Sequence, residues 1–229
     1  MPIKSTAKNI RYNSLDFLRG VAVVLMIFFH LFYDLDIFGY VDIDFSKDFF
    51  WYWLPRLIVF LFMISMGMSL TLAHRKTLRA RPYTLRLLKV GICAIAISVT
   101  TFLMFKNNWV YFGTLHCIFF STLIITPFIK RPHFSLFMFY FFMMLEVLNI
   151  QIPFYEMNHA AMDYIPIWPW VGHSFLGVFF VHYGIHEISL PTNSFTKVIF
   201  FLGKKALPIY LIHQPIMYGI IWAYTSYLS

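Results

Sequence analysis

The sequence predicts an all-α, polytopic membrane protein: a bundle of about seven transmembrane helices with a cytoplasmic N-terminus. Of its 229 residues, 60% are hydrophobic and only 12% are charged, and the mean hydropathy is +0.70. Soluble domains are about 45–50% apolar and about 25% charged. The apolar residues also fall into runs long enough to cross a bilayer, and the basic residues gather in every second loop between them.

The apolar runs approach the roughly 20 residues that a helix needs to cross a hydrocarbon core of about 30 Å. The sixth run is short and has Pro169 at its start, and the seventh contains Pro208 and Pro215, which predict a kink. No soluble segment separates the runs, so we expect residues 1–229 to form a single membrane domain. The runs cover approximately residues 15–34, 54–73, 86–105, 110–129, 134–150, 167–183 and 206–226.

Charge alternates between the loops. Loops 34–48, 106–108 and 151–166 are acidic or nearly neutral, and the intervening segments are basic. The positive-inside rule then places the N-terminus in the cytoplasm and the C-terminus beyond a bacterial inner membrane. Topology and anionic headgroups explain most of the net charge of +8, so no nucleic-acid partner is expected. The basic residues of these intervening segments are Lys4, Lys8 and Arg11, six Lys or Arg within 74–89, Lys130 and Arg131, and Lys197, Lys204 and Lys205.

Four polar residues form a stripe along the first run. Asp16, Arg19, His30 and Asp34 fall within an arc of roughly 60° at 100° per residue. Lipid would not tolerate such a row, so we expect it to face the bundle interior or a wet cavity. The stripe is the strongest indication of function that the residues themselves provide.

His30 is the residue on this stripe best suited to chemistry. Asp34 follows it by one helical turn, the spacing at which a carboxylate accepts a hydrogen bond from an imidazole. Such a contact would fix the tautomer of His30 and raise the basicity of its other nitrogen. The alternative is a histidine that only satisfies the core, with Asp16 and Arg19 as interfacial charges.

The other runs contribute fewer polar residues. Arg56 opens the second run and could either reach toward the headgroups or pair with Asp34 or Asp36. His116 lies in the fourth run, and His213 and Gln214 lie beside Pro215, where loosened backbone could admit polar ligands. Glu146 is interpreted as an interfacial carboxylate.

Three further stretches have competing or simple interpretations. The basic loop 74–89 could hold a phosphate-rich ligand, or it could reflect topology and anionic lipid alone. His182 and His186 have metal-ligand spacing, but no third ligand is evident and no metal is expected. The stretch IPIWPW (165–170) is most simply an aromatic belt with a helix-start proline.

Several stretches resemble one family. RYNSLDFLRGVAVVLMIFFHLFYDLDIFG (11–39) resembles the opening of the bacterial DUF1624 proteins, which are similar to the catalytic domain of heparan-α-glucosaminide N-acetyltransferase. Arg19 and His30 have the spacing of an Arg/His pair on the first span of the wider acyltransferase-3 group. The resemblance continues in residues 56–76, 111–124, 163–178 and 202–216.

The resemblance implies a membrane-embedded acyltransferase. Acetyl-CoA would be bound from the cytoplasm, and the acyl group would pass to a hydroxyl or amine of a sugar or similar acceptor on the far side. Arg19 and His30 would be the family's Arg/His pair, and His30, oriented by Asp34, would act as base or carry the acyl group itself. The matching segments also contain Asp16, Arg56, His116, His213 and Gln214, and the CoA phosphates would bind Arg75, Arg79, Arg81 and Arg86.

Other classes of function stay open from the residues alone. A proton-coupled transporter could use His30, Asp34 and Arg56 as a relay, although the paired inverted halves of many transporters are not seen. A di-haem electron carrier would need facing histidine pairs. The buried stripe argues against a scaffold without catalytic function. A homo-oligomer is compatible with all of these.

Overall fold

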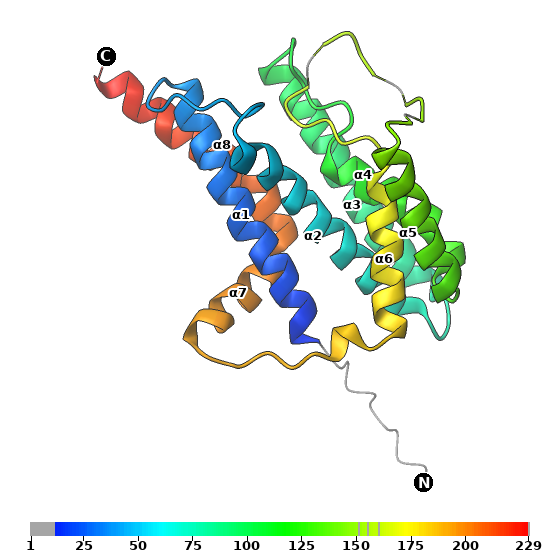
Figure 1. The fold of residues 1–229 in the computed structure, drawn as a ribbon. Coiled ribbons are helices and arrows are strands. Elements are labelled where there is room, and N and C mark those ends of the chain that lie inside the picture. Colours follow the sequence, from blue (N-terminus) through cyan, green and yellow to red (C-terminus); the bar gives the residue numbers. More distant parts are fainter. Residues whose placement is uncertain (1–11, 151, 155, 160, 229) are drawn as a thin grey trace.

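The computed structural model describes residues 12–228 apart from 151, 155 and 160, so Lys4, Lys8 and Arg11 lie outside the described residues. The described residues form helices and no strands (Figure 1). The α-helices are α1 (Asn13–Ile37), α2 (Phe49–His74), α3 (Ala80–Met104), α4 (Thr114–Ile125), α5 (Pro132–Val147), α6 (Trp170–His182), α7 (Ser194–Lys204) and α8 (Ala206–Leu228). Short 3-10 helices η1 (Thr126–Phe128) and η2 (Ile185–Glu187) follow α4 and α6.

Helix lengths divide the bundle into two groups. Among the described helices, α1, α2, α3 and α8 are long and apolar enough to cross a membrane. Helices α4, α5 and α6 are apolar but shorter, with α6 containing only 13 residues. The chain is therefore a helical membrane protein, while the count of seven crossings and the cytoplasmic N-terminus stay predictions. Helix α8 continues through Pro215.

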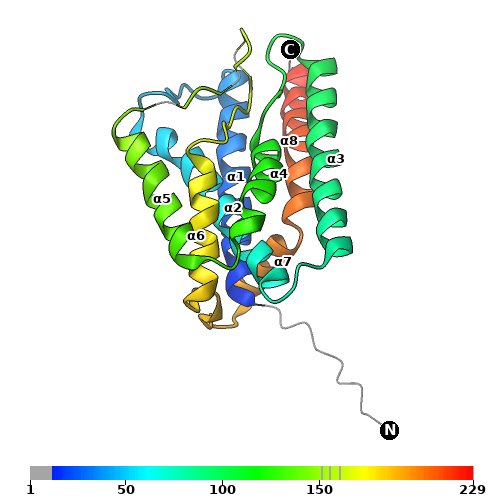
Figure 2. The same ribbon diagram turned by 90° about the vertical axis from the view of Figure 1, so that its right-hand side faces the viewer.

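The helices run between two ends of the bundle (Figures 1 and 2), and the residues at these ends differ in charge. We call the end formed by residues 75–79, 129–131 and 183–205 the basic end. The end formed by residues 38–48, 105–113 and 148–169 is the acidic end. This arrangement follows the alternation of charge in the loops.

Helix α7 is an element that the search for apolar runs missed, because its 11 residues are amphipathic and too short for a span. Asn193 caps its first turn by accepting a hydrogen bond from the Thr196 backbone N–H at 2.8 Å. Helix α7 packs against the start of α1 at the basic end (Figure 1). The backbones approach so closely that a methyl group on Gly20 would overlap the carbonyl of Ile199.

Helices α2 and α6 form the central contact of the bundle. A methyl group on Gly67 would overlap the carbonyl of Ser174, and one on Gly177 would overlap the carbonyl of Ile64. Small residues thus allow close helix packing in MISMGMS (63–69). Helix α6 begins only at Trp170, and its His173 ring lies 5.1 Å from that of Phe60 on α2. The part of α2 nearer the acidic end therefore has no neighbour from α6.

Candidate active site

The polar stripe of α1 faces the protein interior, as predicted. The exposed fractions of Asp16 and Asp34 are 2% and 0%. Near the basic end, Asp16 Oδ1 lies 3.9 Å from Arg19 Nη1. Arg19 also donates a hydrogen bond to Ser69 Oγ on α2. Arg19 and His30 are half-buried, and polar groups placed inside a bundle in this way require partners from neighbouring helices.

Asp34 does not hold His30, contrary to the expectation from their spacing. Asp34 Oδ1 accepts a hydrogen bond from Gln214 Nε2 on α8 at 2.7 Å. His30 Nδ1 and Asp34 Oδ2 are both buried without a hydrogen-bond partner. The spacing permits the contact but does not require it, because α8 presents an amide that competes for the carboxylate. Asp34 and Gln214 instead connect α1 to α8.

The nearest described ring partner of His30 across the helices is His213. The two ring centroids are 5.0 Å apart. His213 Nδ1 lies 2.8 Å from the carbonyl oxygen of Tyr210 and 3.2 Å from that of Ile209. Carbonyl oxygens only accept, so Nδ1 of His213 carries the proton and Nε2 of the neutral ring is an acceptor. That Nε2 is buried without a partner, like Nδ1 of His30.

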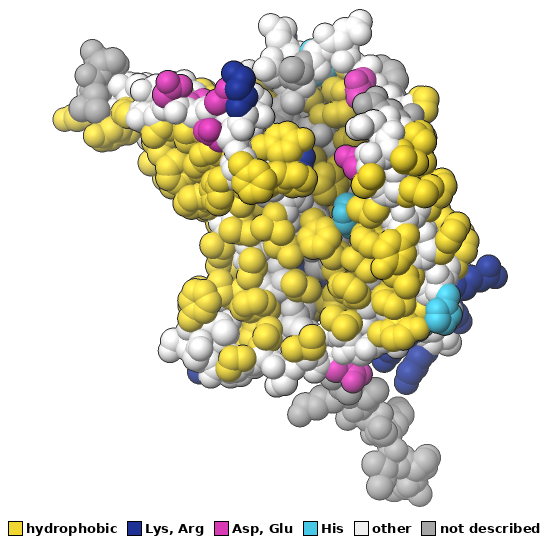
Figure 3. All heavy atoms as spheres, in the orientation of Figure 1, with side chains coloured by type: hydrophobic (Ala, Val, Ile, Leu, Met, Phe, Trp, Pro, Cys, Tyr) yellow, Lys and Arg dark blue, Asp and Glu magenta, His cyan; other side chains and the backbone are white. Residues whose placement is uncertain are grey.

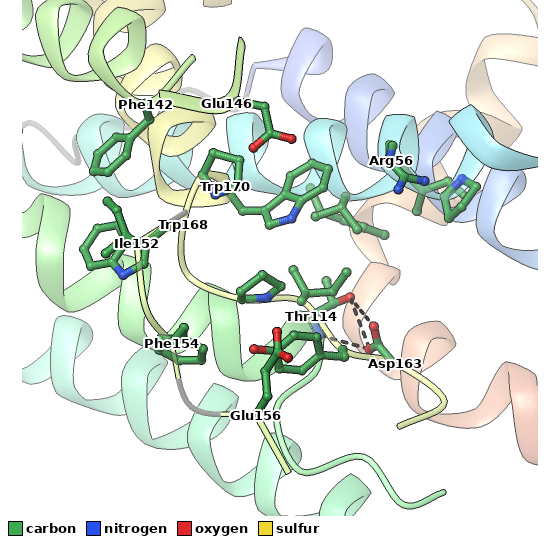
Figure 4. A pocket seen from close by; sticks show the side chains of 18 of the residues that line it. Arg56, Thr114, Phe142, Glu146, Ile152, Phe154, Glu156, Asp163, Trp168 and Trp170 are labelled. Carbon is green, nitrogen blue, oxygen red and sulfur yellow. Dashed lines mark hydrogen bonds between the residues drawn. The ribbon is translucent and has the colours of Figure 1, made fainter. Parts of the chain in front are cut away.

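A cavity of about 920 Å³ lies on the other side of His30. Helices α1, α2 and α5 and the segment 150–170 contribute most of its lining. Figure 4 shows carboxylates and indole rings extending into this space from several elements. The polar and aromatic residues of the lining include His30, Tyr33, Arg56, Thr114, Glu146, Glu156, Asp163, Tyr164, Trp168, Trp170 and Tyr210.

Asp163 is the residue of this cavity that sequence reasoning missed, since it was counted only as a loop charge. Its carboxylate accepts hydrogen bonds from the Thr114 backbone N–H at 3.0 Å and from the Tyr210 hydroxyl at 3.1 Å. These hydrogen bonds join the segment 150–170 to the first residue of α4 and to Tyr210 on α8. Burial raises the pKa of Asp163, and these hydrogen bonds oppose the rise. No local motif could have indicated partners 49 and 47 residues away.

The aromatic stretch 165–170 and Glu146 were both interpreted from the sequence as interfacial, and both also contribute to the cavity. Trp168 and Trp170 line the cavity, and the ring of Trp168 stacks on Phe142 at 5.2 Å, so the aromatic stretch has a role beyond an interfacial belt. Glu146 is exposed, as an interfacial carboxylate would be, but it also lines the cavity.

Arg56 lines the same cavity as His30. Its guanidinium lies over the Tyr52 ring at 3.5 Å and donates to the Tyr52 carbonyl at 2.6 Å. Neither of the expected partners, Asp34 and Asp36, holds it: Asp36 Oδ1 accepts from the backbone of Ile43. The guanidinium of Arg56 therefore extends toward the acidic end, and the side chain also lines the cavity.

His116 does not join this site. Its Nδ1 accepts from the Gly113 backbone N–H at 3.2 Å, and its Nε2 lies 3.2 Å from Ser98 Oγ on α3. The ring thus caps the first turn of α4 and connects it to α3, and His116 is not among the residues that line the cavity. Its place in a resembling segment was not evidence of a place in the site.

The arginines of the predicted CoA site lie at the basic end. Arg79 and Arg81 are exposed, and Arg75 and Arg86 are half-buried. Arg86 on α3 is within Coulombic range of Arg19 on α1, and His74 is within range of both Arg79 and Arg86. Arg19 on α1 and Arg86 on α3 therefore belong to one cluster of positive charge, which the loop sequence alone did not define.

The two histidines with metal-ligand spacing have separate surroundings. His182 Nε2 lies 2.8 Å from the Ile129 carbonyl. His186 is buried against the Tyr12 ring, with the Glu187 carboxylate 3.5 Å from its Nε2. Burial lowers the pKa of His186. Among the described residues, no group of three His, Cys, Asp or Glu side chains is placed to hold a metal ion.

The apolar helices, the inward-facing polar stripe and the cavity beside His30 define an integral membrane protein with a polar site inside its helix bundle. Residues 11–215 match the family described as "Heparan-alpha-glucosaminide N-acetyltransferase, catalytic", and the chain belongs to that family. It is thus a transmembrane protein of the acyltransferase class, as the resemblance implied. No curated protein and no solved structure matched the chain.

Proposed function

We propose that this protein is a membrane acetyltransferase that uses acetyl-CoA at its basic end and modifies a sugar hydroxyl or amine in the cavity at its acidic end. The observation that carries the proposal is His30: it lines the cavity and is backed by His213, in a chain that belongs to an acetyltransferase family. Family membership also favours this function over a proton-coupled transporter.

His30 is the proposed general base. An Nδ1–H on His30 would complement the bare Nε2 of His213, either through one water molecule or after a small ring rotation. Nε2 of His30 would then be free to accept the proton of the acceptor. The acceptor oxygen or nitrogen attacks the thioester carbonyl carbon, the C–S bond breaks, and the CoA thiolate takes up the proton from His30.

Other residues of the cavity have supporting roles in the proposal. Arg56 is the guanidinium that lines the cavity with His30, so it is the proposed donor to the oxyanion of the tetrahedral intermediate. The indoles of Trp168 and Trp170 would pack on sugar faces, and Glu146, Glu156 and Asp163 would accept bonds from sugar hydroxyls. Gln214 and Asp34 would act indirectly, by holding α8 and its His213 against α1.

The donor is proposed to bind at the basic end. Arg19, Arg75, Arg79, Arg81 and Arg86 would hold the CoA phosphates through charge-assisted hydrogen bonds. Asp16 would fix Arg19 in place. Eleven residues of helix separate Arg19 from His30, so the thioester arm would extend roughly 16 Å into the bundle at 1.5 Å per residue.

The first test is whether acetyl-CoA raises the melting temperature of the purified protein in detergent. Ligand that binds only the folded state stabilises it by about 2.7 kcal/mol at a hundredfold excess over Kd. ATP at equal concentration controls for phosphate charge. A rise with acetyl-CoA alone supports the proposal, and no rise at millimolar acetyl-CoA contradicts it.

The second test compares His30→Ala with His116→Ala. Both changes remove an imidazole from a half-buried position, but only His30 lines the cavity. We expect transfer to fall by roughly 10²–10⁴-fold in His30→Ala, the contribution typical of a positioned base. His116→Ala should retain most of its transfer, with melting temperatures reporting that both variants are folded. Substantial transfer by a folded His30→Ala variant would exclude the assignment.

A further inference from the structure

The cavity beside His30 owes its existence to the shortness of α6. Thirteen residues span about 20 Å, against about 30 Å for a hydrocarbon core. Helix α6 packs on both α2 and α5, and it begins level with Phe60 on α2. Toward the acidic end beyond that level, nothing from α6 separates α2 from α5. Pro55, Arg56 and Val59 line the resulting space from α2, and Phe142, Leu145 and Glu146 line it from α5.

This space opens sideways, between α2 and α5. Figure 3 shows a hollow on this face, in which basic, acidic and histidine side chains are visible among hydrophobic ones. Figure 4 shows Arg56 on the α2 side of the cavity and Glu146 on the α5 side. We call the opening bordered by these two residues the lateral mouth. Residues of the segment 150–166 cover the cavity toward the acidic end.

The lateral mouth lies along α2, a helix long and apolar enough to cross a membrane, and not beyond its end. Cavity-lining positions 55–62 of α2 are roughly 9–20 Å from the first residue of that 26-residue helix, at 1.5 Å per residue. The flanking residues are apolar and exposed: Trp53 52%, Leu57 45%, Met144 51% and Val147 79%. Such a surface suits acyl chains. The charged side chains of Arg56 and Glu146 beside it are costly to place near lipid, and a bound polar ligand would offset that cost.

From this geometry we infer that the acceptor is a lipid-linked sugar, which enters through the lateral mouth with its anchor left in the bilayer. The inference rests on the proposed function and names the acceptor's class. The anchor would lie along the exposed apolar faces of α2 and α5, and the sugar would pass between Arg56 and Glu146 toward His30. Three carboxylates and one guanidinium line the cavity, which favours an uncharged polyhydroxyl headgroup over a polyanion.

The test uses a binding readout that does not require transfer. The protein is reconstituted in phosphatidylethanolamine–phosphatidylglycerol vesicles and photolabelled with dodecyl β-glucoside carrying a diazirine in its chain. A diazirine-bearing dodecanol, which lacks the sugar, reports labelling that only reflects contact with lipid. We expect sugar-dependent label on α2 and α5 around the mouth, which excess dodecyl β-glucoside removes and methyl β-glucoside at equal concentration does not.

Two adjacent variants on α5 provide the matched comparison. Glu146 lines the cavity, whereas Val147 is exposed and is not among the lining residues. Both positions are exposed, so a tryptophan at either should leave the fold intact. We expect the competable label to fall at least fivefold in Glu146→Trp and to stay unchanged in Val147→Trp.

Three outcomes would overturn the inference: equal labelling of the two tryptophan variants, competition by methyl glucoside as strong as by dodecyl glucoside, or no competable label. Acetyl-CoA-dependent melting, measured on the same preparations, separates this result from the transferase proposal. Competable label at the mouth without an acetyl-CoA shift would support the lateral mouth and count against the transferase. A shift without competable label would do the reverse.

Discussion

The imidazole rings of His30 and His213 face each other from α1 and α8 with their centroids 5.0 Å apart. Each ring has a buried nitrogen without a hydrogen-bond partner, and the two nitrogens are complementary once His213 Nδ1 donates to the Tyr210 carbonyl. His213, about 180 residues further along the chain, is therefore the orienting partner of the proposed base His30. Asp34, one helical turn from His30, does not have that role.

We therefore predict that His213→Ala impairs turnover more than binding. We expect kcat to fall by roughly 10–100-fold, part of the 10²–10⁴-fold that a positioned base contributes. The KM values for donor and acceptor should change by less than about threefold, because His213 does not line the cavity. Initial-rate kinetics over a range of pH would check this, and the acidic arm of the kcat profile, which reports protonation of the base, should shift. An increase in KM with kcat unchanged would count against an orienting role.

We predict that Arg86→Ala weakens the binding of acetyl-CoA. Arg86 is half-buried on α3 and within Coulombic range of Arg19, so its charge belongs to the cluster at the basic end. A tenfold rise in Kd, about 1.4 kcal/mol, is the expected scale. Lys89→Ala is the control, because Lys89 is exposed on the same helix. Ligand-dependent melting would measure both, and equal weakening in the two variants would indicate only a general effect of net charge.

Asp163 should make stability depend on pH. Burial raises its folded-state pKa above the ordinary value of 3.8, so the folded protein binds this proton more tightly than the unfolded chain does. The stability that this proton provides is fully present below pH 3.8 and is lost as pH rises through the raised pKa. Asp163→Asn should therefore become more stable relative to wild type as pH rises through that window.

Asp44→Asn provides a control of opposite sign. Hydrogen bonds from Ser46 and Lys47 lower the pKa of Asp44, so its contribution is present above the ordinary carboxyl pKa and is lost as pH falls. Melting temperatures of wild type and both variants across the acidic range would measure the two slopes. If Asp163→Asn and wild type gave parallel curves, the raised pKa of Asp163 would be contradicted.

We predict that Gly67→Ala disrupts the contact between α2 and α6. The added methyl group would overlap the Ser174 carbonyl, and backbone cannot move aside as a side chain can. Overpacking of this kind typically costs about 1–3 kcal/mol. Gly219→Ala on α8 is the matched control, since nothing lies within 4 Å of the new methyl group. Melting in detergent should show a loss for Gly67→Ala only, and equal behaviour of the two variants would refute close packing at Gly67.

Much of the fold could be predicted from the sequence. The length and hydropathy of an apolar run predict a membrane-spanning helix without any knowledge of its neighbours. The runs near residues 15–34, 54–73, 86–105 and 206–226 correspond to helices long enough to cross a membrane. The stripe of Asp16, Arg19, His30 and Asp34 indicated the inner face of α1. Helix α7 was missed, because a short amphipathic helix has no such signal in a search for apolar runs.

The candidate site could likewise be predicted only where its features lie on one helix. Helical periodicity identified His30 as an inward-facing histidine, since every residue of that pattern lies on one helix. It could not decide whether Asp34 or a residue of α8 would hold the ring, nor that His116 would cap α4 instead of joining the site. Those choices depend on which helices become neighbours.

By itself, then, the sequence determined the class of protein, the long helices, the polar face of α1 and the family. Only the tertiary structure decided that His213 faces His30, that Asp163 joins Thr114 to Tyr210, and that a short α6 leaves a cavity between α2 and α5. The physical reason is range: hydropathy and helical period act between residues a few turns apart. Partners for buried polar groups, and the spaces between helices, arise only when segments distant in the chain pack together.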